Sequence, residues 1–72
     1  MSEPIWKIRD AQFLRDNPDF AAWIAELNKI DWLVEGYGGP VEDSTGVMCW
    51  YDNFKMGETP LLAAKSDREN WE

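Results

Sequence analysis

The residues that could support catalysis are few, and histidine is absent from the 72-residue sequence. Histidine is the side chain that most often performs acid–base chemistry near neutral pH. The single cysteine, Cys49, lies between Met48 and Trp50, with acidic residues on either side of that segment. A thiol needs a base or a positive environment to become a nucleophile. We therefore expect Cys49 to be a core residue and the protein not to be an enzyme.

Two short segments have some features of ligand-binding loops, but neither is complete. Residues 36–40 have the glycines of a phosphate-binding loop without its Gly-Lys-Ser/Thr ending, and Glu35 and Glu42 flank them. Residues 43–46 (Asp-Ser-Thr-Gly) offer too few ligands for a calcium loop of the EF-hand type. Without histidine the usual zinc-binding sets are also missing. The sequence thus predicts no cofactor and no metal site.

Negative charge and aromatic residues concentrate in one segment of the chain. The net charge is -7 and there are five tryptophans. Residues 31–54 contain five acidic residues and neither Lys nor Arg, so they contribute -5 of that total. A surface of one sign repels nucleic acids and anionic membranes and attracts basic proteins, and aromatic side chains anchor such interfaces. We predict that this segment binds a partner protein through Asp31, Glu35, Tyr37, Glu42, Asp43, Trp50 and Asp52.

Each part of this interpretation has a plainer alternative. A net charge of this size is ordinary for a small domain and keeps it in solution. Trp32 and Trp50 would also serve as cross-strand partners in the core. That second alternative would remove the aromatic anchors from the interface but would leave its charge.

The clearest predicted element is a helix over residues 18–30. Asn17 suits the N-cap, Pro18 the first helical position, and Asp19 the positive end of the helix dipole. Apolar residues then recur at helical spacing on one face, namely Phe20, Trp23, Ile24, Leu27 and Ile30. Extending the helix would place Asp31 within that stripe, so the helix should end near Ile30.

The remaining segments favour short strands, and together they predict a single α+β domain covering residues 1–72. Aromatic and branched residues indicate strands over 32–35 and 47–52, joined by a glycine-containing loop. Residues 61–65 fit either a helix or an edge strand. Residues 5–9 read as a strand or extended lead-in, followed by a helical turn over 11–15. In this fold the 18–30 helix packs on a small antiparallel sheet.

Location and assembly follow from the same features. The N-terminus shows no basic region followed by an apolar run, and no apolar stretch approaches the roughly 18–20 residues that span a bilayer. We therefore expect a cytoplasmic protein. Cores of this size supply only about 3–5 kcal/mol, and a lone cysteine cannot form an internal disulfide. Partner binding or a homodimer is the remaining common source of support, and Ala21, Ala22 and Ala25 would allow close approach of a second helix.

A tiny, acidic, tryptophan-rich chain without catalytic groups resembles in general type the small inhibitors of bacteriophages and mobile elements, including anti-CRISPR proteins. The resemblance implies stoichiometric binding to a host protein in the host cytoplasm. The target we favour is a nucleic-acid-binding defence or transcription complex, bound through nucleic-acid mimicry by residues 31–54, with no direct contact to nucleic acid or membrane. Two other classes stay open: an oligomeric trap for a nucleotide or other small molecule with an aromatic pocket, and a structural or assembly subunit.

Overall fold

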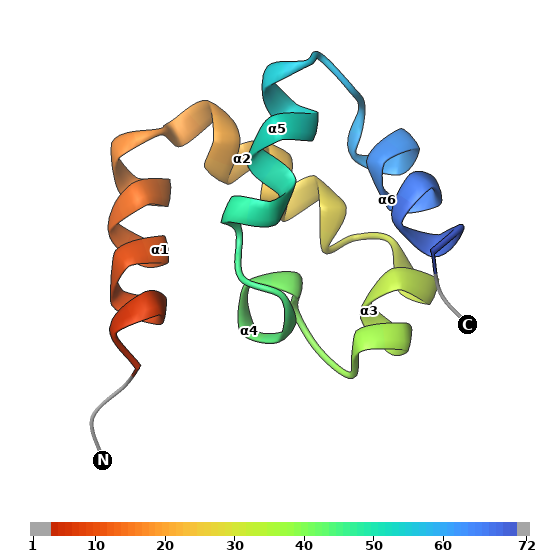
Figure 1. The fold of residues 1–72 in the computed structure, drawn as a ribbon, viewed down its shortest axis with the longest axis horizontal. Coiled ribbons are helices and arrows are strands. Elements are labelled where there is room, and N and C mark those ends of the chain that lie inside the picture. The colour runs from red at the N-terminus through yellow and green to blue at the C-terminus, as the bar shows by residue number, and fades with distance from the viewer. Residues whose placement is uncertain (1–3, 71–72) are drawn as a thin grey trace.

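Every regular element in the computed structural model is a helix within the residues that it describes, 4–70 (Figure 1). Five helices of seven or more residues and one single turn follow each other along the chain. They are α1 (Ile5–Asp16), α2 (Pro18–Leu27), α3 (Asp31–Tyr37), α4 (Val41–Ser44, the single turn), α5 (Met48–Lys55) and α6 (Pro60–Arg68). The principal extents are 33 × 27 × 18 Å.

The predicted α+β fold is therefore wrong, because the segments assigned to strands are helical. Residues 32–35 lie in α3, residues 48–52 in α5 and residues 61–65 in α6. Branched and aromatic side chains favour strands chiefly because they fit half-buried surfaces, and a packed helix offers such a surface too. In α5 and its N-cap residue Val47, the inward-facing residues have helical spacing, namely Val47, Trp50, Tyr51 and Phe54. The alternation over 47–52 had concealed that period.

The N-terminal segment also differs from the prediction. Residues 5–9 are not a strand, because they form one continuous helix with residues 11–15. Asn17 does not cap α2 with its side chain; its Nδ2 donates to the carbonyl oxygen of Phe13 (2.9 Å) and closes the end of α1 instead. A single polar residue thus separates two helices.

The helix predicted over residues 18–30 is confirmed in its position and its buried face, although it ends at Leu27. Phe20, Ile24 and Leu27 are at most 1% exposed. The chain turns over residues 28–30, and the extended backbone of Ile30 leads into α3. The indole Nε1 of Trp23 donates to the carbonyl oxygen of Glu58 (2.9 Å), which ties α2 to the loop before α6.

The core surrounds α2, which packs against α1, α4, α5 and α6. Small residues of α6, Ala63 and Ala64, allow that helix to approach closely. The fully buried residues come from α2 and the segments after it: Phe20, Ile24, Leu27, Leu33, Val41, Val47, Trp50, Ala63 and Ala64. None of the described helices is long and apolar enough to cross a membrane.

Candidate functional site

The seven residues predicted to bind a partner come from different helices. They are divided among α3, α4 and α5, and the fold uses some of them internally. Glu42 accepts two hydrogen bonds from the Nδ2 of Asn28 (both 3.0 Å), and the Oδ1 of that Asn28 accepts from the backbone N–H of Val41 (2.9 Å). Asp43 pairs with Lys7 of α1 (2.9 Å). These two carboxylates hold α4 in place.

The two aromatic anchors of the predicted interface are also structural. Trp50 is 3% exposed, and its Nε1 donates to the Oγ1 of Thr45 (2.9 Å). The hydroxyl of Tyr37 donates to the carboxylate of Asp67 on α6. Trp50 therefore belongs to the core, but in a helix and not in the cross-strand pair of the plainer alternative, and its part in an interface stays a prediction. Trp32 is half-buried beneath Arg68, whose guanidinium lies 4.9 Å from the ring centre. Trp71 lies outside the described residues.

Four of the five predicted acidic residues are exposed, namely Asp31, Glu35, Asp43 and Asp52. Asp31 and Glu35 stand one helical turn apart on α3, and Asp52 lies on the outer side of α5. Asp43 pairs with Lys7 although it is exposed, and Glu42 is the partly buried member of the set.

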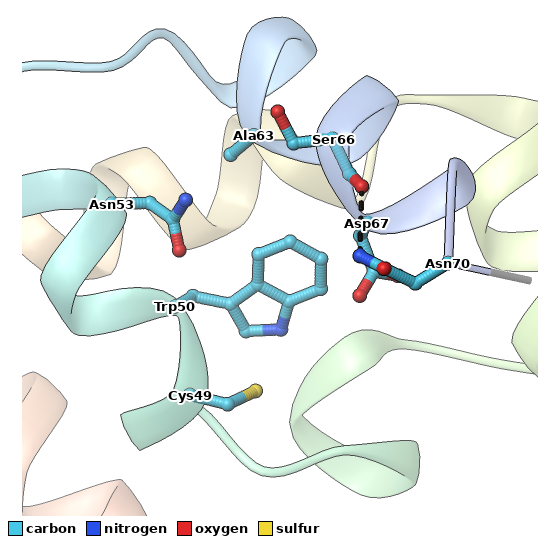
Figure 2. A pocket seen from close by; sticks show the side chains of 7 residues that line it. All are labelled: Cys49, Trp50, Asn53, Ala63, Ser66, Asp67 and Asn70. Atoms are coloured by element: carbon cyan, nitrogen blue, oxygen red, sulfur yellow. Dashed lines mark hydrogen bonds between the residues drawn. The ribbon is translucent and has the colours of Figure 1, made fainter.

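A hollow with several polar side chains lies between α5 and α6, and Figure 2 shows it from close by. We call it the α5–α6 crevice. It has a volume of about 190 Å³. Its walls are formed by side chains from α5, from α6 and from Asn70, which follows α6. The residues are Cys49, Trp50, Asn53, Ala63, Ser66, Asp67 and Asn70. The indole ring of Trp50 stands in the middle of this group, with the polar side chains around it (Figure 2).

Hydrogen bonds orient the polar walls of the α5–α6 crevice. The Nδ2 of Asn53 donates to the Oε1 of Glu58 (3.2 Å), and the Nδ2 of Asn70 donates to the carbonyl oxygen of Ser66 (3.2 Å; dashed in Figure 2). Each amide therefore commits a donor to the protein. Among the described residues that line the crevice, Asp67 carries the only charge.

Cys49 lies at this crevice rather than in the core, which corrects the prediction for it. Although the residue as a whole is exposed, its Sγ lies against the carbonyl oxygens of Thr45 (3.9 Å) and Gly46 (3.7 Å). Burial of the thiol, with the nearby negative charge of Asp67 adding to it, raises the pKa of Cys49 above its usual value. The thiol is therefore protonated at neutral pH, and its surroundings do not activate it as a nucleophile.

The sequence matches no protein-family model and no curated protein, and no solved structure matches the chain. Among the described residues, no three Cys, Asp or Glu side chains gather closely enough to hold a metal ion. Arguments about function therefore depend on the charge and shape of the molecule itself.

The sequence interpretation missed most of the crevice. Ser66, Asp67 and Asn70 follow Ala63 at spacings of three, four and seven residues, which places them on one face of α6. Cys49, Trp50 and Asn53 have the corresponding spacing on α5. The helical spacing of these residues is present in the sequence, but it indicates a shared face only when both segments are recognised as helices.

Proposed function

We propose that this protein is a small acidic binding protein that attaches to a basic surface of another protein and blocks it. The observation that carries the proposal is the surplus of carboxylates on its outer surface. The chain has 14 acidic and 7 basic residues. Once folded, several of its cations are held against its own groups, so the field that a partner meets is set by acidic side chains.

Four cationic side chains are engaged in this way. Lys7 pairs with Asp43 and Lys29 with Glu26, both at 2.9 Å. The Nζ of Lys55 lies 5.5 Å from the ring centre of Tyr51, and Arg68 covers Trp32. Within the described residues, the exposed carboxylates of Asp31, Glu35 and Asp52 form no ion pair with a lysine or arginine. Charge of one sign steers association with a basic partner and speeds it.

The finer part of the proposal concerns the target. Proteins that bind nucleic acids present basic grooves, and carboxylates on a small rigid surface can occupy such grooves in place of phosphates. We propose that the target is a nucleic-acid-binding complex of a host cell and that the protein acts in the host cytoplasm as an inhibitor of the phage or mobile-element type. The mimicry would use α3 and the outer side of α5, because Glu42 and Asp43 brace α4.

The test is capture of partners from a lysate of the natural host by the full chain and by two triple variants. Asp31→Asn, Glu35→Gln and Asp52→Asn together remove the exposed charges of α3 and α5. Asp16→Asn, Asp19→Asn and Glu26→Gln remove the same number of charges from α1 and α2, which makes them the matched control. We expect the wild type and the control to retain one partner with a basic surface, and the first variant to lose it.

Salt provides the second arm of this test. Raising the salt to about 1 M shortens the screening length to about 3 Å, so a charge-steered complex should dissociate. Equal capture by all three proteins, or capture that is insensitive to salt, would contradict the proposal. Loss of binding in the control alone would place the interface on α1 and α2 instead.

A second candidate, an assembly subunit that associates through α1, is favoured by one observation. Ile5, Trp6 and Ile8 are 70%, 45% and 53% exposed, although α1 is a well-formed helix. Exposed apolar residues on one helix suit a second copy of the chain as well as another protein. Sedimentation at several concentrations distinguishes the candidates: a subunit should form an oligomer that Ile8→Asp dissociates. A nucleotide trap is weaker, because Asp67 in the crevice would repel phosphate.

A further inference from the structure

We propose that copies of this chain associate head to tail, with the outer face of α1 from one copy seated in a groove between α2 and α6 of the next. The inference rests on the second candidate of the proposed function, because it names the surface that α1 would meet in an assembly. Figure 1 shows α1 on one side of the molecule and α3 and α6 on the other, so the two surfaces can meet only between copies.

The outer face of α1 has an exposed apolar end and an exposed basic end. Its residues recur at spacings of three and four, which places them on one side of the helix, and all are exposed: Ile5, Ile8, Arg9, Gln12, Arg15 and Asp16. Ile5 and Ile8, at the N-terminal end, are 70% and 53% exposed. Within residues 4–70, neither Arg9 nor Arg15 forms an ion pair. The face therefore offers apolar area and two cations that the fold itself does not use.

An apolar groove lies between the end of α2 and the start of α6, and we call it the α2–α6 groove. It has a volume of about 370 Å³ and is lined by Glu26, Lys29, Ile30, Thr59, Pro60 and Leu61. Ile30, Pro60 and Leu61 supply its apolar surface, and Leu61 is 47% exposed. Glu26 and Lys29 pair with each other at 2.9 Å, so they add no net charge to the groove. The groove can therefore receive apolar side chains such as Ile5 and Ile8 of another copy.

The acidic residues of α3 continue the surface of the α2–α6 groove. Ile30 lines the groove and immediately precedes α3, so Asp31 begins that helix directly beside it. Asp31 and Glu35 are exposed and, within the described residues, form no ion pair. An apolar groove that leads to carboxylates matches a helix whose apolar end leads to arginines. The two surfaces are thus complementary in charge and in the order of their apolar and charged parts.

Charge also decides against a dimer in which two α1 helices pair with each other. Two outer faces in contact would bring Arg9 and Arg15 of both copies together, and juxtaposed like charges oppose association. Residues 17–70 carry four basic and ten acidic side chains, net -6. A basic helix face is therefore attracted to the body of a second copy rather than to its α1.

A contact between two different surfaces leaves one of each unused at the ends of a pair. Copies should therefore add in series, and the assembly should not stop at a closed dimer. Each contact involves few side chains, and small interfaces are weak or transient. We expect association at about 0.1 mM and above.

The test is sedimentation of the full chain and of two variants, from about 0.01 to about 1 mM. Ile8→Asp disables the outer face of α1. Leu61→Asp disables the groove, and an aspartate in the first turn of α6 suits the helix dipole. Each variant alone should associate at least about tenfold more weakly than the wild type, because the contact would bury an unpaired charge. Mixed in equal amounts, they should form a pair that does not grow, since one copy keeps its groove and the other its α1 face.

Two further comparisons support the assignment of the surfaces. Met56→Asp is the matched control, because Met56 is 77% exposed at the C-cap of α5 and belongs to neither surface, so it should associate as the wild type does. The charged parts are tested by reversing both members of a pair, Arg9→Glu with Arg15→Glu in one protein and Asp31→Lys with Glu35→Lys in another. Each should associate about tenfold more weakly than the wild type, and mixing the two should restore association.

The outcomes separate this inference from the functions proposed above. Recovery on mixing shows that both aspartate variants are folded, and a mixture that forms no pair would overturn the inference. Assembly that is lost in Ile8→Asp but retained in Leu61→Asp would overturn the groove and leave association through α1 standing. A wild type that stays monomeric at every concentration would overturn both. Partner capture by Ile8→Asp, which keeps the exposed acidic residues of α3 and α5, tests the acidic binding protein separately.

Discussion

The first helix and the body formed by α2–α6 differ in burial, in charge and in the contacts that hold them. The body contains all the fully buried residues among those described, whereas α1 contributes only half-buried ones, Phe13 and Leu14. Residues 4–16 carry three basic and two acidic side chains, net +1. Residues 17–70 carry four basic and ten acidic ones, net -6. Figure 1 shows α1 on one side of the molecule and α3 and α6 on the other.

The contacts between α1 and the body include polar contacts and the edges of aromatic rings. Phe13 meets Tyr51 edge-on, with ring centres 5.0 Å apart. An Oδ2 of Asp10 accepts from the backbone N–H of Val47 (3.1 Å), and Lys7 pairs with Asp43. The comparison indicates that stability resides in the body, while α1 is an attached helix whose outer side is available to a partner.

The largest expected effect comes from comparing one apolar residue of each region. Leu27 is 0% exposed, and replacing a buried leucine by alanine costs about 2–5 kcal/mol, which approaches the whole stability of a domain this small. Ile8 is 53% exposed, so Ile8→Ala should change the free energy of unfolding by less than about 0.5 kcal/mol. Urea unfolding followed by circular dichroism measures both. Similar losses would show that α1 is part of the core in solution.

The next effect concerns the amide that holds α4 to α2. Asn28→Ala should lower the free energy of unfolding by about 1–3 kcal/mol, because it leaves the backbone N–H of Val41 without its acceptor and Glu42 without its donor. Asn70→Ala, which breaks one exposed hydrogen bond to Ser66, is the matched control and should cost less than about 0.5 kcal/mol. Thermal unfolding measures the stability of both variants, and Asn28→Ala should have the lower melting temperature. Equal melting temperatures would show that Asn28 does not hold α4 to α2.

Two glycines test how closely α1 is docked. Gly46 and Gly57 have φ angles of 76° and 81°, so alanine at either costs about 1–2 kcal/mol in backbone strain. A Cβ at Gly46 would also lie 3.1 Å from the Oδ2 of Asp10, whereas at Gly57 nothing lies within 4 Å. Gly46→Ala should therefore be the more destabilising, and it should speed hydrogen exchange at the Val47 amide, which Gly57→Ala should leave unchanged. Exchange at Val47 that is equal in both variants would mean that α1 is not held through Asp10.

The smallest effect is expected at the ion pair between α1 and α4. Lys7 and Asp43 are both partly exposed, and pairs of this kind contribute up to about 1 kcal/mol. Asp43→Asn should cost no more than this. The loss should shrink in high salt, which screens the pair. A loss that does not change with salt would show that the side chains act through packing.

The sequence predicted the centre of the fold and missed its periphery, for physical reasons. The stripe of α2 combines a proline start with five apolar residues at helical spacing, so several signals agree. α3 has seven residues, which is two turns and too few to display a period. In α5, Met48 and Cys49 are apolar but exposed, so apolar residues appeared on both sides of an apparent strand.

The candidate site could be predicted only in its charge. The excess of acidic residues is a property of composition and survives any fold. Which carboxylates are paired within the fold depends on partners far away in the chain, such as Lys7 for Asp43 and Asn28 for Glu42. The crevice depends on the pairing of α5 with α6 and on the contact from Tyr37 to Asp67, and local sequence does not specify either.

The packing of α6 on α2 also constrains when the protein can fold during its synthesis. Helical proteins with mostly local contacts fold quickly once their residues are available. Here the apolar stripe of α2 cannot be fully buried until Ala63 and Ala64 have been synthesised, about forty residues later. A ribosome adds roughly 5–20 residues per second. A nascent chain that stops before α6 therefore exposes Phe20, Ile24 and Leu27 to chaperones and proteases. Premature termination should give rapid turnover rather than a partly active fragment.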